Sequence, residues 1–244
     1  MKLPPELVDE IIGHLPPGDK RSLRNCSLVA KSWIFPSQKR LFGVVEITGE
    51  NLRQWLDNIS PTHIDLLGHV RHLLYREYPK GSIKQVHLSL HDYLPSFRCL
   101  SHFTLSFART PLRLQQVQKF SAFRYTLSEI TLARCVVTKS SLVTLINYFP
   151  DLTSFDLRGL EYHKEHGQTP PLVRHHFRKL FANVWGEGSL GLVDELSKLG
   201  LRFEEVVISD FLPQRKWPDF SRRVICGFGE TVKCLRVLGS SNRT

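Results

Sequence analysis

A triplet of apolar residues recurs along the middle of the chain and constrains its fold more than any other feature. In each copy, apolar residues occupy the first, fourth and sixth positions. The clearest copies are Leu100, Phe103 and Leu105; Leu127, Ile130 and Leu132; and Leu152, Phe155 and Leu157, at intervals of 27 and 25 residues. A regular interval of this length is typical of stacked units that each bury one face against the next.

The second copy, from Leu127 to Cys135, reads LSEITLARC and is similar to the LxxLxLxxC/N unit of leucine-rich repeats. The resemblance implies that each triplet is a strand and that a return segment leads to the next one. In such a unit the Cys135 side chain would hydrogen-bond backbone where the chain leaves its strand. We expect return helices over residues 115–125 and 139–149, because apolar residues follow a helical spacing in the second range.

Weaker copies extend the pattern over residues 43–244. They are Val70 and Leu73; Ile83, Val86 and Leu88; Phe203, Val206 and Ile208; and Val232, Leu235 and Val237. Together they predict an α/β architecture, an irregular β/α solenoid in which residues 158–188 are a divergent repeat or an insertion. A compact α+β domain whose strands share a leucine spacing is the alternative.

Residues 3–33 follow a helical pattern instead. Leu7, Ile11 and Leu15 lie four residues apart, and Val8 and Ile12 widen the apolar stripe. A unit of roughly thirty residues buries too little apolar area to be stable by itself. Its apolar face is therefore expected to pack on another surface.

The boundaries of two short helices are also visible in this segment. Pro4 and Pro5 suit a first helical turn, and the Pro-Pro-Gly sequence of residues 16–18 ends the helix. Asp19 is placed to cap a second helix that continues to Trp33. An all-helical hairpin over residues 1–42 is predicted.

These residues resemble the F-box motif in its LPPEL form. The match comprises Leu3, Pro4, Glu6, Leu7, Ile11, Leu15, Leu23, Cys26, Val29, Lys31 and Trp33, and it departs from the common pattern at the inserted residues 16–18. The resemblance implies docking on the Skp-type adaptor of a cullin-RING ubiquitin ligase. The residues expected to bind the adaptor are Leu3, Pro4, Leu7, Val8, Ile11, Ile12, Leu15, Leu23, Val29, Lys31 and Trp33. The alternative is an ordinary amphipathic hairpin at the edge of a globular domain.

Composition limits the cellular setting. With 244 residues and 41% hydrophobic content, the chain can bury a core beyond the helical hairpin. Every apolar run ends before the roughly 18 residues that a membrane span needs, and the N-terminus lacks a signal sequence. The five cysteines form no CxxC pair, so free thiols in a reducing compartment are expected. We expect a cytoplasmic or nuclear protein with no membrane contact.

The sequence indicates no catalytic chemistry. His163, Glu165, His166, His175 and His176 gather in one segment, but their spacing fits neither HExxH nor another metal-ligand pattern. Phosphate loops, GxGxxG turns and GxSxG elbows are absent from the sequence. We therefore expect a non-catalytic protein without metal or cofactor.

The net charge of +10 lies almost entirely beyond residue 50. The basic clusters are Arg71, Arg76, Lys80 and Lys84; Arg174, Arg178 and Lys179; and Arg215, Lys216, Arg222 and Arg223. They could meet an acidic or phosphorylated partner, or they could be solvated faces of mixed charge. Because the clusters lack regular aromatic interleaving, they do not favour nucleic-acid binding.

Side chains between the triplet positions would form the opposite, substrate-binding face of the sheet. The residues expected there are His102, Thr104, Ser106, Glu129, Thr131, Ser154, Asp156 and Arg158. The sequence thus predicts a substrate-recognition subunit of a Skp-cullin-F-box ubiquitin ligase, which binds an unidentified protein. The alternatives are a basic solenoid that binds nucleic acid and an interaction scaffold that acts without ubiquitin transfer.

Overall fold

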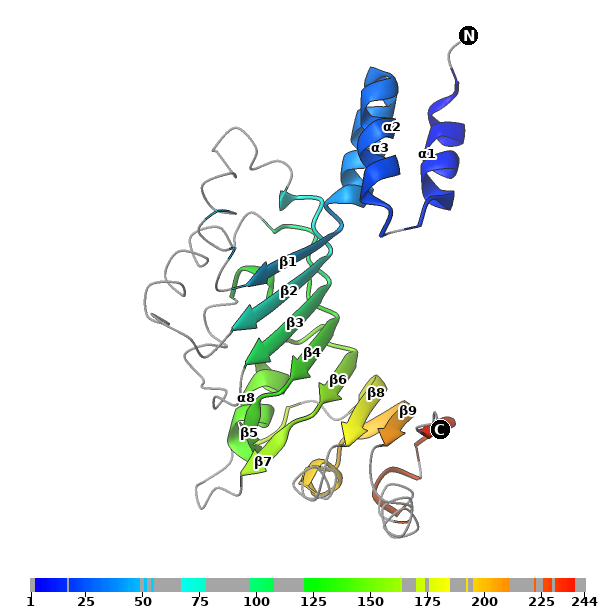
Figure 1. Cartoon of the computed structure of the whole chain (residues 1–244). Coiled ribbons are helices and arrows are strands. Elements are labelled where there is room, and N and C mark those ends of the chain that lie inside the picture. The colour runs from blue at the N-terminus through cyan, green and yellow to red at the C-terminus, as the bar shows by residue number, and fades with distance from the viewer. Residues whose placement is uncertain are drawn as a thin grey trace, which may run out of the picture.

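The computed structural model describes residues 3–16, 18–48, 51, 54, 67–77, 97–107, 121–163, 170–173, 176–184, 192, 195–210, 222, 226–229 and 231–239. Its helices are α1 (Pro5–His14), α2 (Lys20–Val29), α3 (Lys31–Leu41), the 3-10 helix η3 (Ser121–Phe123) and α8 (Lys139–Tyr148). Its strands are β1 (Val44–Thr48), β2 (His72–Glu77), β3 (His102–Phe107), β4 (Glu129–Ala133), β5 (Val136–Thr138), β6 (Ser154–Arg158), β7 (Glu161–His163), β8 (His176–Val184), β9 (Arg202–Asp210) and β10 (Cys234–Gly239). The expected order, N-terminal helices followed by a mixed α/β region, is confirmed (Figure 1).

The N-terminal helical module, residues 3–41, contains three helices where the sequence predicted two. Pro5 occupies the first turn of α1, and the Asp19 carboxylate caps α2 by accepting a hydrogen bond from Ser22 N at 3.0 Å. The second predicted helix breaks at Ala30, whose extended backbone (φ −159°, ψ 159°) separates α2 from α3. Trp33 therefore belongs to the third helix.

A small apolar core holds the module together. Val8, Ile12 and Leu23 are fully buried, and Leu15 and Trp33 pack against them. The helices are also tied by the Arg40 guanidinium, which donates a hydrogen bond to the carbonyl oxygen of Leu15. The predicted stripe on α1 is consequently divided, with one half of it turned into this core.

Eight parallel strands form the main sheet in the order β1-β2-β3-β4-β6-β8-β9-β10, which is their order along the chain. Figure 1 shows the strands succeeding one another from the helical module toward the C-terminus. A second, two-stranded parallel sheet pairs β5 with β7. Because consecutive parallel strands need a crossover, each step along the sheet consumes a full return segment of chain.

The apolar triplets lie in this sheet in register. With Leu100, Leu127 and Leu152 as position 1, residues at positions 4 and 6 line one face as buried columns. The columns are Leu73, Phe103, Ile130, Phe155, Leu180 and Val206 at position 4, and Tyr75, Leu105, Leu132, Leu157, Ala182 and Ile208 at position 6. The predicted return helix over residues 139–149 is α8, whose Leu142, Leu145 and Ile146 belong to the same core.

Two strands of the main sheet lie in segments for which no strand was predicted. β1 carries Val45 and Ile47, and β8 carries Leu180 and Ala182. Residues 158–188, expected to be a divergent repeat or an insertion, supply β7 and also β8, which pairs with β6 and β9 inside the main sheet. The weaker copy at Ile83, Val86 and Leu88 lies outside the described residues.

A backbone pattern repeats where successive strands begin. The carbonyl oxygen of Gly43 accepts hydrogen bonds from Arg71 N and His72 N, both at 3.0 Å. Each equivalent carbonyl farther along accepts two consecutive N–H groups in the same way: Arg71 from Ser101 and His102, Ser101 from Ser128 and Glu129, Ser128 from Thr153 and Ser154, and Thr153 from Arg178 and Lys179. All five acceptors occupy position 2, directly after the first apolar residue of the triplet.

A ladder of hydroxyl groups accompanies this pattern. Ser101 Oγ donates to the Arg71 carbonyl at 3.3 Å, Ser128 Oγ to the Ser101 carbonyl at 3.2 Å, and Thr153 Oγ1 to the Ser128 carbonyl at 3.1 Å. We call Ser101, Ser128 and Thr153 the hydroxyl ladder. Its three hydrogen bonds tie the starts of β2, β3, β4 and β6 together, and it ends at Thr153, because Arg178 occupies position 2 in the next strand.

The chain leaves β4 as the LSEITLARC resemblance implies. Cys135 is buried, and its Sγ lies 3.2 Å from the Ala133 carbonyl oxygen and 3.8 Å from that of Leu105. The thiol therefore satisfies backbone acceptors at this exit, the role that the motif suggests for Cys or Asn.

Candidate functional site

The surface of the helical module exposes the other half of the α1 stripe. Leu3, Leu7 and Ile11 are 46%, 45% and 42% exposed, although all are apolar. In α1, residues 7 and 11 face outward while residues 8 and 12 face the core, because neighbouring residues differ by about 100° around a helix axis. We call Leu3, Leu7 and Ile11 the exposed α1 face.

The remaining residues predicted to bind an adaptor fall into two groups. Pro4, Val29 and Lys31 are exposed, whereas Leu15 and Trp33 are half-buried. Val8, Ile12 and Leu23 are at most 2% exposed and belong to the core of the module. The sequence could not divide the stripe, because the division depends on where α2 and α3 pack.

Three further apolar side chains of the module are exposed and were not among the predicted adaptor residues. They are Leu28 at the end of α2, and Ile34 and Phe35 in α3. The Phe35 ring meets the His69 ring edge-on, with centroids 5.0 Å apart. The two apolar residues that follow Trp33 in the sequence could have indicated this exposed surface. They were not included because the second helix was predicted to end at Trp33.

The predicted substrate-binding residues share one face of the main sheet. Parallel register aligns His102 with Glu129 and Ser154, and it aligns Thr104 with Thr131 and Asp156. Ser106 and Arg158 continue this face toward the strand ends. We call this surface, made of positions 3, 5 and 7, the polar sheet face. Ser154 is buried among its neighbours, and the other predicted residues are half-buried or exposed.

Charges on the polar sheet face neutralise one another. Arg76 pairs with Glu46 at 3.1 Å and His102 with Glu129 at 2.6 Å, while Arg158 Nε donates to both Asp156 carboxylate oxygens at 2.9 Å. Glu205 lies 3.7 Å from Lys179 and 3.5 Å from Arg236. Among the described strands, each Arg, Lys, Asp and Glu at positions 3, 5 and 7 therefore has an ion-pair partner.

Two histidines lie side by side at the β2 end of this face. His72 Nε2 is 2.8 Å from Thr104 Oγ1, and the His72 and His102 rings are 5.5 Å apart. Burial lowers the pKa of His72, and the neighbouring His102 and Arg158 charges lower it further, against an opposing effect of Glu129. The lowered pKa favours the neutral form of His72, whose ring can share a hydrogen bond with the Thr104 hydroxyl.

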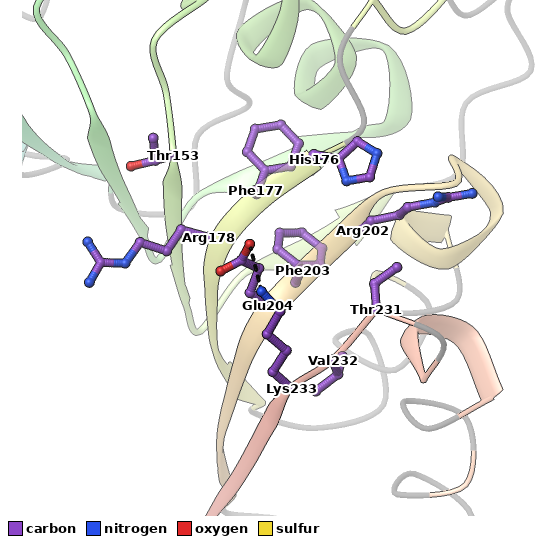
Figure 2. Close-up of a pocket in the computed structure, with 10 residues that line it drawn as sticks. All are labelled: Thr153, His176, Phe177, Arg178, Arg202, Phe203, Glu204, Thr231, Val232 and Lys233. Carbon is purple, nitrogen blue, oxygen red and sulfur yellow. Dashed lines mark ion pairs between the residues drawn. The ribbon is translucent and has the colours of Figure 1, made fainter.

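A hollow of about 640 Å³ lies where β8, β9 and β10 begin (Figure 2). We call it the β8–β10 hollow. It is lined by Thr153, His176, Phe177, Arg178, Arg202, Phe203, Glu204, Thr231, Val232 and Lys233. The buried rings of Phe177 and Phe203 are 5.7 Å apart, and Lys233 pairs with Glu204 at 3.4 Å. Arg178 belongs to a predicted basic cluster; Arg202 and Lys233 were not predicted.

Several expected features fall outside the described residues. Of the histidine-rich segment, Glu165, His166 and His175 are among them, as are the basic residues Lys80, Lys84, Arg174, Arg215, Lys216 and Arg223. Over the part of the chain that the structure describes, no set of three or more His, Cys, Asp and Glu residues is arranged to hold a metal ion. None of the helices in that part of the chain has the length and apolar character of a membrane span.

Comparison with protein families supports the reading of the helical module. Residues 1–34 match the family model described as F-box domain. This match confirms the resemblance inferred from the LPPEL pattern, and it ends within α3, one residue after Trp33. No curated protein matches the chain.

Proposed function

We propose that this F-box-bearing chain is a non-catalytic substrate-recognition subunit of a Skp-cullin-F-box ubiquitin ligase. The observation that carries the proposal is the F-box match over residues 1–34 together with an exposed α1 face. Leu3, Leu7 and Ile11 keep large apolar side chains in solvent while the module already has its own core. Such a surface gains stability by packing on a partner, which here is the Skp-type adaptor.

We propose further that residues 43–244 form a leucine-rich-repeat-like solenoid. The parallel strands in chain order, the paired N–H groups on each position 2 carbonyl and the hydroxyl ladder support this interpretation. The paired N–H groups recur at five successive strand junctions and the hydroxyl ladder at three of them, as expected when similar units stack on their neighbours. The solenoid would hold the substrate protein, in the cytoplasm or the nucleus.

In this role the chain contributes positioning and no chemistry. Ubiquitin transfer would be carried out by the RING subunit and its conjugating enzyme, on a substrate that the solenoid keeps within reach. The hydrogen bonds from Arg71 N and His72 N to the Gly43 carbonyl favour such a role, because they join the chain directly after α3 to the second strand of the sheet. A firm connection between docking helices and recognition sheet would keep the substrate oriented.

Capture of the full chain by a purified Skp-type adaptor tests the proposal. The parent should be retained, and Leu7→Asp with Ile11→Asp should abolish retention, because two carboxylates on the exposed α1 face would be desolvated at the interface. Val173→Asp is the matched control, since Val173 is exposed and lies outside the module. Failure to retain a parent that is folded by circular dichroism would overturn the proposal, as would equal loss in the control.

A further inference from the structure

The starts of the last three strands differ chemically from the starts of β3, β4 and β6. At β3, β4 and β6, position 2 carries the short hydroxyl residues of the ladder, whose side chains fold back onto the preceding carbonyl. At β8, β9 and β10 the same position carries Arg178, Glu204 and Lys233. Long charged side chains replace the ladder at the strand starts that line the β8–β10 hollow.

The β8–β10 hollow differs from the polar sheet face because some of its charged side chains have no partner among the described residues. Arg178 and Arg202 have no ion pair or hydrogen-bonded carboxylate within the part of the chain that the structure describes, and both side chains are exposed. The one acid of the lining, Glu204, is already paired with Lys233. Among the described residues that line the hollow, the three cations Arg178, Arg202 and Lys233 therefore outnumber the single acid by two.

The arrangement of these cations indicates the shape of a ligand. In Figure 2 the Arg178 side chain extends to one side of the hollow, His176 and Arg202 lie on the other, and the Glu204–Lys233 pair lies between them. The two guanidinium groups extend away from each other on opposite sides of this pair, an arrangement that fits an extended ligand better than a single small anion. An extended segment crossing the strand starts could present one anionic group to each arginine, and guanidinium groups bind such oxyanions by paired hydrogen bonds.

We propose that the β8–β10 hollow binds an extended acidic segment of the substrate protein, through anionic side chains that pair with Arg178 and Arg202. This inference rests on the proposed substrate-receptor function and moves the main contact from the polar sheet face to the amino-terminal ends of the last strands. The floor offers little apolar surface, because Phe177 and Phe203 are almost fully buried. Recognition is therefore electrostatic and weakens as salt rises.

Fluorescence anisotropy with three labelled peptides of one length tests the site. The peptides alternate Gly with Glu, with phosphoserine or with Gln, and binding to the full chain is measured at low salt. The Glu or the phosphoserine peptide should bind and the Gln peptide should not. The stronger of the two anionic peptides identifies the source of the charge, carboxylate or phosphate. Equal binding of the Gln peptide, or binding of no peptide, would overturn the site.

Two double variants with the same change in net charge locate the contact. Arg178→Gln with Arg202→Gln should weaken binding of the anionic peptide about tenfold, since each of the two lost contacts is between exposed charges and is worth roughly threefold. Arg76→Gln with Arg236→Gln removes two cations that have carboxylate partners on the sheet face, and it should change the affinity less than about twofold. Equal losses would indicate a general positive field and refute the site.

Two further readouts separate the competing explanations. A single-stranded oligonucleotide that binds more tightly than either anionic peptide, with the same dependence on Arg178 and Arg202, would reject a protein ligand in favour of nucleic acid. Adaptor capture by the Arg178→Gln, Arg202→Gln variant should equal that of the parent. If the parent is not captured but binds the acidic peptide, the ligase function fails and the peptide site stands.

Discussion

Arg134 and Gly159 adopt the same left-handed backbone conformation, with φ of 55° and 56°, at equivalent points directly after β4 and β6. The amide of each donates to a carbonyl of the following strand, Arg134 N to Arg158 O at 2.8 Å and Gly159 N to Asn183 O at 3.2 Å. Glycine adopts this conformation freely, whereas a side chain at Cβ makes it unfavourable. The same turn is therefore relaxed after β6 and strained after β4.

Replacing Arg134 by Gly should stabilise the protein by about 0.5–1 kcal/mol, because the strain at φ 55° is removed and the Arg134 side chain is exposed. Urea unfolding of the full chain measures the change. The reciprocal variant, Gly159→Ala, should lower the free energy of unfolding by about 1 kcal/mol. A destabilised Arg134→Gly protein would show that the arginine side chain contributes more than the backbone strain costs.

Ser128→Ala should destabilise the protein by about 1 kcal/mol, because the Ser101 carbonyl loses the hydroxyl of the ladder at 3.2 Å. The bond from the Thr153 hydroxyl to the Ser128 carbonyl at 3.1 Å is kept in this variant, because its acceptor is a backbone atom. Ser106→Ala on the polar sheet face is the control and should change stability less. The unfolding midpoint in urea, at unchanged slope, is the measurement.

Protonation of His72 should make the fold less stable in acid. Its pKa lies below the ordinary 6.5, so between that value and its folded pKa the unfolded chain binds a proton that the folded chain does not. Stability is full above about pH 6.5 and falls as the pH drops through this window. His72→Asn should remove part of the decrease in unfolding free energy between pH 8 and pH 5.5.

The control for this pH dependence is His163→Asn, which replaces a histidine that is exposed in β7 and lies outside the main sheet. An identical pH profile for the parent and His72→Asn would mean that the histidine cluster does not govern acid stability.

Phe123→Ala should cost about 3–5 kcal/mol, the usual range for a fully buried aromatic side chain. The Phe123 ring packs edge-on against Phe103 at 5.4 Å between centroids, so its loss also leaves a cavity under the sheet. Tyr125→Ala is the control, since Tyr125 is largely exposed and only two residues away. Thermal unfolding followed by circular dichroism distinguishes the two variants; equal effects would contradict the core assignment.

A column of aromatic residues was missed because its spacing from the triplet varies. Phe97 and Phe149 lie three residues before position 1, whereas Phe123 lies four residues before it, and all three are buried. Each accepts, through its carbonyl oxygen, a hydrogen bond from the start of the next strand: Leu100 N to Phe97, Leu127 N to Phe123 and Leu152 N to Phe149. The turn between the aromatic residue and position 1 varies by one residue in length. The rings therefore stay in the core, although their interval in the sequence is not constant.

Two strands were missed for a related reason. Phe177, Leu180 and Ala182 obey the spacing of the triplet, as do Phe42, Val45 and Ile47, with a phenylalanine at the first position of both and the small Ala182 at the last position of one. Aromatic and small residues substitute there because a buried column tolerates different shapes when its neighbours compensate in volume. The 1-4-6 spacing, applied to all apolar residues, would have identified both β1 and β8.

The sequence by itself determined the local patterns of this protein: the proline-initiated first helix, the Asp19 cap, the F-box spacing and the apolar triplets that become strands. These depend on residues close together in the chain. Only the tertiary structure decided which half of the α1 stripe stays exposed and which charges are neutralised. Glu46 meets Arg76 and Glu205 meets Arg236 from separate strands, while Arg178 and Arg202 meet no carboxylate among the described residues. Ion pairing and burial depend on distance in space, which the parallel register sets between segments that are far apart in sequence.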